Sequence, residues 1–161
     1  MDKQKIFRER YCSPLGNMVI TSDGESVTEL RFSDEDFPGK TDLPIFRETE
    51  KWLDIYFSDG VPDFIPKLSP GGTLFQKKVW KILLEIPYGQ KMSYKEIAEK
   101  IREEEKREHM SAQAVGGAVS KNPILLLIPC HRVIGNNGSL TGYSAGIDRK
   151  RKLLEKEKIM I

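Results

Sequence analysis

The first 32 residues contain three short segments in which hydrophobic residues, several of them β-branched or aromatic, are mixed with polar ones. Short segments of this kind, bounded by turn sequences, are typical of strands. The sequences Ser-Pro-Leu-Gly at 13–16 and Ser-Asp-Gly-Glu at 22–25, which separate the segments, are typical of turns. The pattern therefore predicts a small antiparallel sheet with strands at 6–12, 17–21 and 27–32.

A helical period follows the predicted sheet. We expect a helix over residues 43–57, with Phe46, Leu53 and Phe57 on one face. No cluster of residues in this half of the chain indicates chemistry. Cys12 lies in the first predicted strand, and we expect it to pack as a small buried hydrophobe.

The second half of the chain has clear helix-start signals. Thr73 and Ser93 each begin a sequence of the form Ser/Thr-x-x-Glu/Gln, which is the pattern of a capping box. The first of these two helices ends at Pro-Tyr-Gly, and the second buries Ile97, Ala98 and Ile101. The apolar face of the first helix consists of residues 75, 79, 82, 83 and 86.

Three further elements are predicted beyond these two helices. A charged link at 102–109 leads to Ser111, which we expect to cap a third helix at 112–121. The apolar run at 125–128 precedes a proline, so we expect it to be extended and buried. A last helix is expected at 148–158.

Consecutive helices in this half are compatible with a helix-turn-helix module, although any ordinary helix pair gives the same pattern. The third helix is unusual because residues 112–120 are almost all small and include Gly116 and Gly117. Glycine inside a helix costs about 1 kcal/mol relative to alanine. Such a sequence is expected where the backbone approaches another object closely, either a second helix or the sugar-phosphate wall of a DNA groove.

Composition limits the class of protein. With 161 residues and 39% hydrophobic residues, the chain is expected to form one ordinary domain or two small ones in a soluble protein. No apolar run reaches the roughly 20 residues that cross a bilayer, and no secretory signal follows Met1. The only cysteines are Cys12 and Cys130, far apart in sequence, so we expect a reducing, cytoplasmic location and no disulfide framework.

Charge divides the chain at a linker-like stretch. The net charge of +2 argues by itself against a dedicated nucleic-acid binder. Residues 1–69 contain 9 Lys and Arg against 14 Asp and Glu, whereas residues 70–161 contain 17 against 10, so the net charges are −5 and +7. Residues 64–72 between them contain two prolines and two glycines. We therefore predict domains at 1–69 and 70–161, and the asymmetry indicates polyanion binding by the second domain or a chance fluctuation of surface charge.

The strongest chemical signal is the sequence Cys130-His131-Arg132. A cysteine reacts as its thiolate, which neighbouring cations favour, and a base next to it is normally oriented by a third group. Glu155 and Glu157 are candidates for that third group, and a water molecule could bridge Cys130 and His131. A packed core cysteine beside a surface histidine would give the same sequence.

Residues 128–134 read Ile-Pro-Cys-His-Arg-Val-Ile, which resembles the active-site signature of the O6-alkylguanine-DNA alkyltransferases. These DNA repair proteins are also called methylated-DNA–protein-cysteine methyltransferases. The resemblance extends over most of residues 72–157, at 72–80, 86–89, 93–94, 114–118, 122–123, 137–143 and 153–157. It implies an α+β fold, with a small antiparallel, ribonuclease H-like sheet domain followed by a helical domain that contains a helix-turn-helix and the active-site cysteine.

The resemblance also implies a role for each site residue. Cys130 would take the alkyl group from O6-alkylguanine, and possibly from O4-alkylthymine, in an irreversible step without metal or organic cofactor. His131 would remove the thiol proton through a water, and Glu157 would orient His131. Asn122 would support the active-site segment, and the Tyr94 hydroxyl would protonate the leaving base. The pocket wall would consist of Val133, Tyr143, Ser144 and Ala145.

Double-stranded DNA is the implied partner, with the damaged nucleotide flipped out of the helix. The helix-turn-helix would enter the minor groove, and no membrane or obligate protein partner is expected of a monomer. Gln113 stands where the family commonly has a finger arginine, and Ala145 where glycine is common. Two cysteines without a CxxC pair argue against a zinc site. The implied DNA-binding residues are Ser93, Ala112, Gln113, Ala114, Gly116, Gly117 and Arg132.

Two other functions stay open beside a stoichiometric alkyltransferase. An alkyltransferase-like protein would bind lesions without repairing them, but such relatives lack the reactive cysteine that Cys130 provides here. A cysteine hydrolase would use Cys130 and His131, would turn over, and would need an oxyanion hole that nothing else in the sequence indicates.

Overall fold

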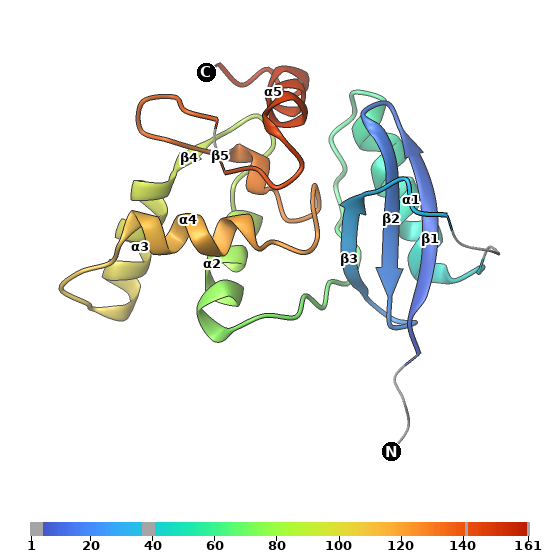
Figure 1. Cartoon of the computed structure of the whole chain (residues 1–161), viewed down its shortest axis with the longest axis horizontal. Helices are drawn as coiled ribbons and strands as arrows, with labels where there is room; N and C mark the ends of the chain where they lie inside the picture. Colours follow the sequence, from blue (N-terminus) through green and yellow to red (C-terminus); the bar gives the residue numbers. More distant parts are fainter. Residues whose placement is uncertain (1–4, 37–40, 141, 161) are drawn as a thin grey trace. The chain divides into compact units, whose positions relative to one another are not determined.

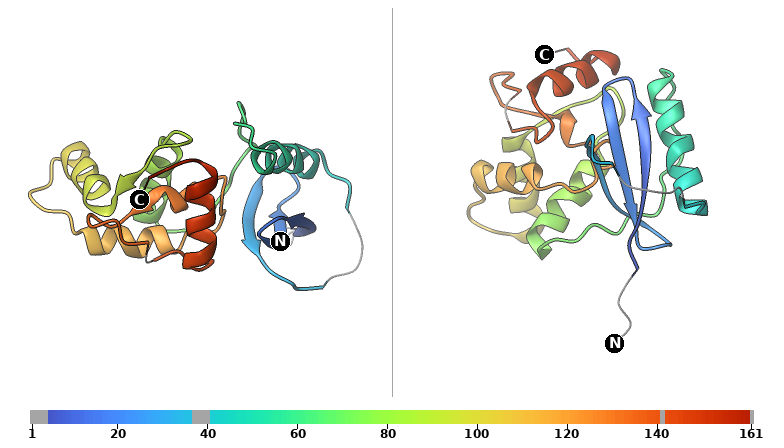
Figure 2. Two further views of the ribbon diagram at one scale, coloured as in Figure 1. Left: turned by 90° about the horizontal axis from the view of Figure 1, so that it is seen from above. Right: turned by 45° about the vertical axis from the view of Figure 1, so that its right-hand side comes forward.

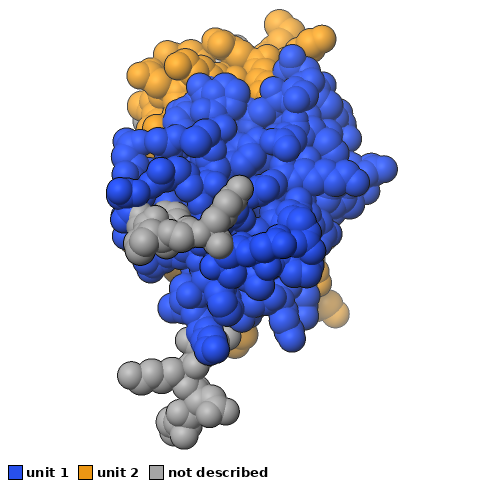
Figure 3. Space-filling view, turned by 90° about the vertical axis from the view of Figure 1, so that its right-hand side faces the viewer, with its two compact units in different colours: residues 1–71, 123–125 blue, residues 72–122, 126–161 orange. Residues whose placement is uncertain are grey.

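The computed structural model describes residues 5–36, 41–140 and 142–160. The chain divides into two compact units (Figure 3). Unit 1 consists of Met1–Gly71 and Pro123–Leu125, and unit 2 of Gly72–Asn122 and Leu126–Ile161. The first division therefore falls two residues after the boundary expected from sequence, and residues 70, 71 and 123–125 of the predicted second domain belong to unit 1.

Unit 1 is a three-stranded antiparallel sheet with one helix. Its strands are β1 (Phe7–Ser13), β2 (Gly16–Ser22) and β3 (Val27–Phe32), in the order β1-β2-β3. Helix α1 (Pro44–Phe57) packs on one face of this sheet (Figures 1 and 2). The predicted strands and helix are confirmed to within one residue at each end, and strand β1 begins and ends one residue later than expected.

Two side-chain predictions in unit 1 are wrong. Cys12 is exposed, because β1 directs it away from the buried face of the sheet. On α1, Phe57 is only half-buried, and Trp52 and Tyr56 take the buried positions together with Phe46 and Leu53. The helix turns its aromatic residues 52 and 56, four positions apart, toward the sheet.

The free edge of β3 is covered by two distant segments. Val27 N donates to Lys67 O at 2.8 Å, and Ser69 N donates to Val27 O at 2.8 Å. Leu30 N donates to Pro123 O and Leu125 N to Leu30 O, both at 2.9 Å. Because these pairings are parallel extensions of the sheet, residues 123–125 join unit 1 although their neighbours in sequence belong to unit 2.

Unit 2 is mainly helical. Its elements are α2 (Leu74–Leu84), β4 (Met92–Ser93), α3 (Tyr94–Glu105), α4 (Ala112–Ser120), the 3₁₀ turn η1 (Cys130–Arg132), β5 (Val133–Ile134) and α5 (Ile147–Lys156). Both predicted capping boxes are present, since Thr73 and Ser93 accept from the backbone N–H groups of Gln76 and Glu96. Ser111 caps α4 as expected.

Helices α2, α3 and α4 pack against one another in unit 2. The Trp80 indole N–H donates to Ala118 O at 2.9 Å and fixes α2 against α4. Buried Ile97, Ala98 and Ile101 line the inner face of α3, as predicted. These contacts give α4 a defined position with its glycines accessible from one side.

Two backbone predictions in unit 2 need correction. Residues 102–105, expected in a charged link, form the last turn of α3, because Lys106 in the left-handed region (φ 55°) ends the helix only there. Residues 125–128 form a buried turn instead of an extended segment, with Leu126 at φ 68°. No helix in the described residues is long and apolar enough to cross a membrane.

Candidate active site

The Cys130 thiol lies at the start of the turn η1 and is 3% exposed. Asn122, immediately after α4, supports this turn, because its buried Nδ2 donates to Ile128 O at 2.8 Å. The Cys130 N–H donates to the same carbonyl at 2.8 Å. The glycine-rich helix and the cysteine are thus joined through a short, hydrogen-bonded stretch of chain.

Burial dominates the electrostatics of the thiol. It raises the pKa of Cys130 to about 11, against the opposing effects of a hydrogen bond from Asn122 and the positive charge of Lys150. The sequence argument assigned the stabilisation of the thiolate to His131 and Arg132. The structure corrects this assignment, because both of those side chains are directed to Glu157.

His131 and Glu157 form a buried pair. The distance from His131 Nε2 to Glu157 Oε2 is 2.5 Å, and both side chains are fully buried. Burial lowers the pKa of His131, against the opposing effect of Glu157, so the imidazole is neutral near pH 7. Because an ionised carboxylate can only accept, the ring proton of neutral His131 belongs on Nε2, and Nδ1 has the lone pair of a base.

Glu157 is the centre of this buried network. It accepts from Arg132 Nε at 2.8 Å and from Gly89 N at 3.0 Å, besides its contact with His131. Burial would raise its pKa, but the hydrogen bonds and charges of His131 and Arg132 outweigh burial and bring the pKa to about 2. Glu157 caps the C-terminus of α5, whereas Glu155 is exposed, so the structure selects Glu157 from the two candidates.

Two residues of the predicted DNA-binding set have local partners instead. The Arg132 side chain is 8% exposed, and its second nitrogen donates to Ile86 O at 2.7 Å. The guanidinium is therefore not available to a phosphate, which corrects its assignment. Ser93 is buried and its hydroxyl accepts from Glu96 N at 3.0 Å as the cap of α3.

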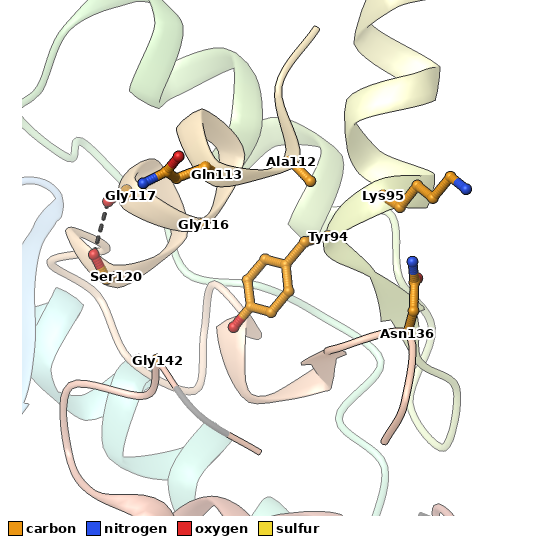
Figure 4. A pocket seen from close by; sticks show the side chains of 9 residues that line it. All are labelled: Tyr94, Lys95, Ala112, Gln113, Gly116, Gly117, Ser120, Asn136 and Gly142. Carbon is orange, nitrogen blue, oxygen red and sulfur yellow. Dashed lines mark hydrogen bonds between the residues drawn. The ribbon is translucent and has the colours of Figure 1, made fainter. Parts of the chain in front are cut away.

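Tyr94 begins α3 and lies between α4 and the segment before Tyr143 (Figure 4). A Cβ atom built on Gly142 would lie 2.9 Å from the Tyr94 hydroxyl, and one on Gly116 would lie 3.7 Å from the ring. Burial, together with the charge of a Cys130 thiolate, raises the pKa of Tyr94, so the phenol keeps its proton at neutral pH. The missing side chain of Gly142 makes room for the hydroxyl, whereas a Cβ atom at position 116 would be in ordinary contact with the ring.

An open pocket of about 610 Å³ lies over this tyrosine (Figure 4). Four of the seven predicted DNA-binding residues line it, and Ala114 does not. Gly117 is exposed, and a Cβ atom there would meet nothing within 4 Å. The lining residues are Tyr94, Lys95, Ala112, Gln113, Gly116, Gly117, Ser120, Asn136 and Gly142.

The predicted pocket wall is partly buried. Val133 is fully buried, and Tyr143 is 8% exposed with a hydroxyl that has no hydrogen-bond partner among the described residues. Ser144 is exposed and Ala145 is half-buried. Burial raises the pKa of Tyr143, and the negative charge of a Cys130 thiolate raises it further, because the two side chains are near each other.

Sequence reasoning missed Lys150. This residue is 1% exposed and its Nζ donates to Val133 O at 2.5 Å. A signal was present, because Lys150 shares one face of α5 with buried Leu153, Leu154 and Glu157 at helical spacing. No group of His, Cys, Asp or Glu in the described residues could hold a metal ion.

The fold and the site define a class of α+β protein in which a buried cysteine is followed by a histidine that pairs with a glutamate. Residues 74–159 match the family model described as 6-O-methylguanine DNA methyltransferase, DNA binding domain. A relative from Haemophilus influenzae named methylated-DNA–protein-cysteine methyltransferase is 41% identical over 162 residues, covering 96% of this chain and 87% of the relative.

Solved structures agree with this match. The Mycobacterium tuberculosis O6-methylguanine methyltransferase superposes with a TM-score of 0.82 at 39% identity, covering 96% of this chain and 93% of that chain. Mycobacterium tuberculosis OGT in complex with DNA gives a TM-score of 0.81 at 41% identity, covering 94% and 92%. The chain belongs to the methylated-DNA–protein-cysteine methyltransferase family. The expected α+β fold is confirmed.

Proposed function

We propose that this protein repairs DNA by moving the alkyl group of O6-alkylguanine, foremost a methyl group, irreversibly to Cys130. The observation that carries this proposal is the buried thiol of Cys130 beside the 2.5 Å His131–Glu157 pair, in a chain of the methyltransferase family. O4-alkylthymine is a second possible substrate of the same chemistry.

The protonation states of His131 and Tyr94 support nucleophilic transfer. The neutral His131 ring, oriented by Glu157, takes the Cys130 proton through a bridging water, which is general-base work. The thiolate attacks the alkyl carbon, so a sulfur–carbon bond forms while the carbon–oxygen bond breaks and its electron pair stays on guanine. The Tyr94 phenol, protonated because its pKa is raised, donates to the departing base. Asn122 keeps the Cys130 turn in place through its bond to Ile128.

The product explains single use. A thioether is not hydrolysed by water, so one molecule of protein repairs one base. The step needs no metal and no organic cofactor, because the alkyl group is already activated for transfer by its bond to the base. Val133, Tyr143, Ser144 and Ala145 form the wall of the alkyl pocket. Ala145, with its extra methyl group, reduces the room for bulky adducts.

The DNA-binding face is the surface of α4 around the pocket, in a helix-turn-helix formed by α3 and α4. The target atom is inaccessible in stacked duplex DNA, so the nucleotide is flipped into the pocket. Small residues at 112, 114, 116 and 117 permit the helix backbone to approach the minor groove closely. Gln113 wedges into the gap left by the flipped base without adding a charge.

Charge supports the same face. Residues 70–161 have a net charge of +7, so phosphate contacts provide affinity with little sequence preference, and affinity falls with salt. The protein acts as a monomer in the cytoplasm, where a reducing environment keeps Cys130 competent.

The test uses an oligonucleotide duplex with one O6-methylguanine and mass spectrometry of the Cys130 peptide. We expect one added methyl group on Cys130, in equal amount to the base repaired, in the wild type and in Cys12→Ser. Cys130→Ser is expected to leave the lesion in place. Unmodified Cys130 beside unrepaired DNA would overturn the proposal, as would repair of several bases by one protein molecule, which a hydrolase would give.

A further inference from the structure

Lys150 is a buried cation with no acidic partner among the residues that the structure describes. Its side chain points into unit 2 from α5, where it is 1% exposed. The Nζ atom donates to Val133 O at 2.5 Å and lies 5.9 Å from the centre of the Tyr94 ring. It forms no ion pair with any described residue. Its neighbours Arg149 and Arg151 on the same helix are more exposed to solvent than Lys150.

The other buried charges in the site compensate one another. Glu157 is paired with Arg132 at 2.8 Å, and His131 is neutral because its pKa is lowered. The network of these three side chains therefore has no net charge near pH 7. Lys150 adds one positive charge that is not balanced, and a buried ammonium without an anion is costly. Its position is best explained by an anion that forms only during the reaction.

We propose that the Lys150 ammonium is the counter-ion of the negative charge that forms on Cys130 and then passes to the departing guanine. Lys150 acts through Cys130 and is not a proton donor in this scheme. The inference rests on the proposed methyl transfer and adds to it the residue that stabilises its charge.

The charge balance of the step supports this role. Before attack the negative charge is on sulfur. When the sulfur–carbon bond forms and the carbon–oxygen bond breaks, the electron pair and the charge move to guanine, until Tyr94 supplies a proton. The reacting groups thus have one negative charge throughout. A cation fixed to Val133 O, just after the Cys130 turn, and 5.9 Å from the centre of the Tyr94 ring stabilises that charge without having to move.

The titratable groups around Cys130 agree with this assignment. Cys130 interacts electrostatically with Lys150, Tyr94 and Tyr143, and of these only Lys150 is positively charged. Burial lowers the pKa of Lys150 to about 8, against the opposing effect of Cys130, so the ammonium form dominates at pH 7. Burial is the main cause of the lowered pKa of His131, and the charges of Arg132 and Lys150 lower it further, so that ring can accept a proton.

The experiment measures the thiol without DNA. In a Cys12→Ser background, methyl iodide is the probe, and the rate of Cys130 methylation is followed by intact mass as a function of pH. Replacing Lys150 by Met or Gln is expected to raise the thiol pKa by about one unit or more, and to slow methylation at pH 7 on the order of tenfold. Lys152→Met, at an exposed position of the same helix, is the matched control and should leave the profile unchanged.

Lys150→Arg keeps the positive charge and tests whether loss of the Lys150 proton shapes the pH profile. The wild-type rate should rise less steeply with pH above about 8, where Lys150 loses its proton, and the arginine variant should lack this flattening. The same thiol pKa in Lys150→Met, Lys150→Gln and the wild type would overturn the proposal, even if the variants were less stable. Failure of the methyl transfer from DNA would refute the proposed function separately, since the methyl iodide profile does not depend on DNA.

Discussion

Glu157→Gln tests the buried network by removing one charge and almost no volume. The amide can still accept from Gly89 N, as the carboxylate does at 3.0 Å. It can no longer compensate the Arg132 guanidinium, which lies at 2.8 Å and is 8% exposed. The substitution therefore leaves a buried cation without its anion while the packing stays the same.

The magnitude follows from the pKa of Glu157. The carboxyl group is shifted from its ordinary value of 4.5 to about 2. Since one pKa unit corresponds to about 1.4 kcal/mol, the ionised form contributes about 3 kcal/mol to the free energy of unfolding. This agrees with the roughly 3–5 kcal/mol that breaking a buried ion pair costs.

The sign of the pH dependence is fixed by the same shift. A carboxyl group with a lowered pKa in the folded state stabilises the protein above the unfolded-state pKa. That contribution is lost as the pH falls through the folded-state pKa. The difference between wild type and Glu157→Gln should therefore be full above about pH 5, and less than half of its full value at about pH 3.

Urea denaturation at several pH values measures this difference. Glu155→Gln, at the exposed penultimate residue of α5, is the control and should change the free energy of unfolding by less than about 0.5 kcal/mol. A loss below about 1 kcal/mol in Glu157→Gln at neutral pH, or a loss that stays constant down to pH 3, would refute the reasoning.

Two further predictions concern glycines. Gly142→Ala should slow single-turnover methyl transfer at least tenfold, because φ is 89° and the new Cβ atom would lie 2.9 Å from the Tyr94 hydroxyl. Gly138→Ala has a similar φ of 81° but no neighbour within 4 Å, so an equal loss there would argue against displacement of Tyr94. Gly117→Leu should stabilise the exposed face of α4 by about 1 kcal/mol in urea denaturation, yet weaken binding to duplex DNA in fluorescence anisotropy. Unchanged affinity would exclude a close approach of DNA at Gly117.

Local signals in the sequence were sufficient to predict much of the fold. The capping boxes at Thr73 and Ser93 were predicted because each is closed within four residues. The same holds for the Ser111 cap and for the turn sequences that separate β1, β2 and β3. Contacts of this kind depend on near neighbours in sequence, which a single chain displays directly.

Contacts between residues far apart in the sequence determine the features that local sequence signals did not predict. The proline after Ile128 favoured an extended run at 125–128. In the structure Leu30 pairs with Pro123 and Leu125, and the chain turns directly after this pairing, with Leu126 at φ 68°. Arg132 and Lys150 are charged, and their burial depends on carbonyl groups of Ile86 and Val133, 46 and 17 residues away. A distant acceptor of this kind leaves no mark near the buried residue in sequence.

Cys130, His131 and their pairing with Glu157 could be anticipated because the motif at 128–134 is specific. The electrostatic source of thiolate stabilisation could not. Adjacency in sequence suggested His131 and Arg132, but both are directed to Glu157, and the cation near the thiol comes from α5. Which charged residue acts on a buried thiol depends on where its side chain is directed in the folded protein.

Residues 123–125 belong to unit 1, so the chain passes between the two units three times. During synthesis the edge of β3 cannot receive its last partner until residue 125 has emerged, well after the rest of unit 1. Cutting the chain at the linker after Gly71 would therefore not release two complete folding units, because one fragment would retain the missing edge of the other. The stretch that closes the sheet ends at Leu125, five residues before Cys130, so during synthesis unit 1 has all of its residues before the reactive cysteine is added.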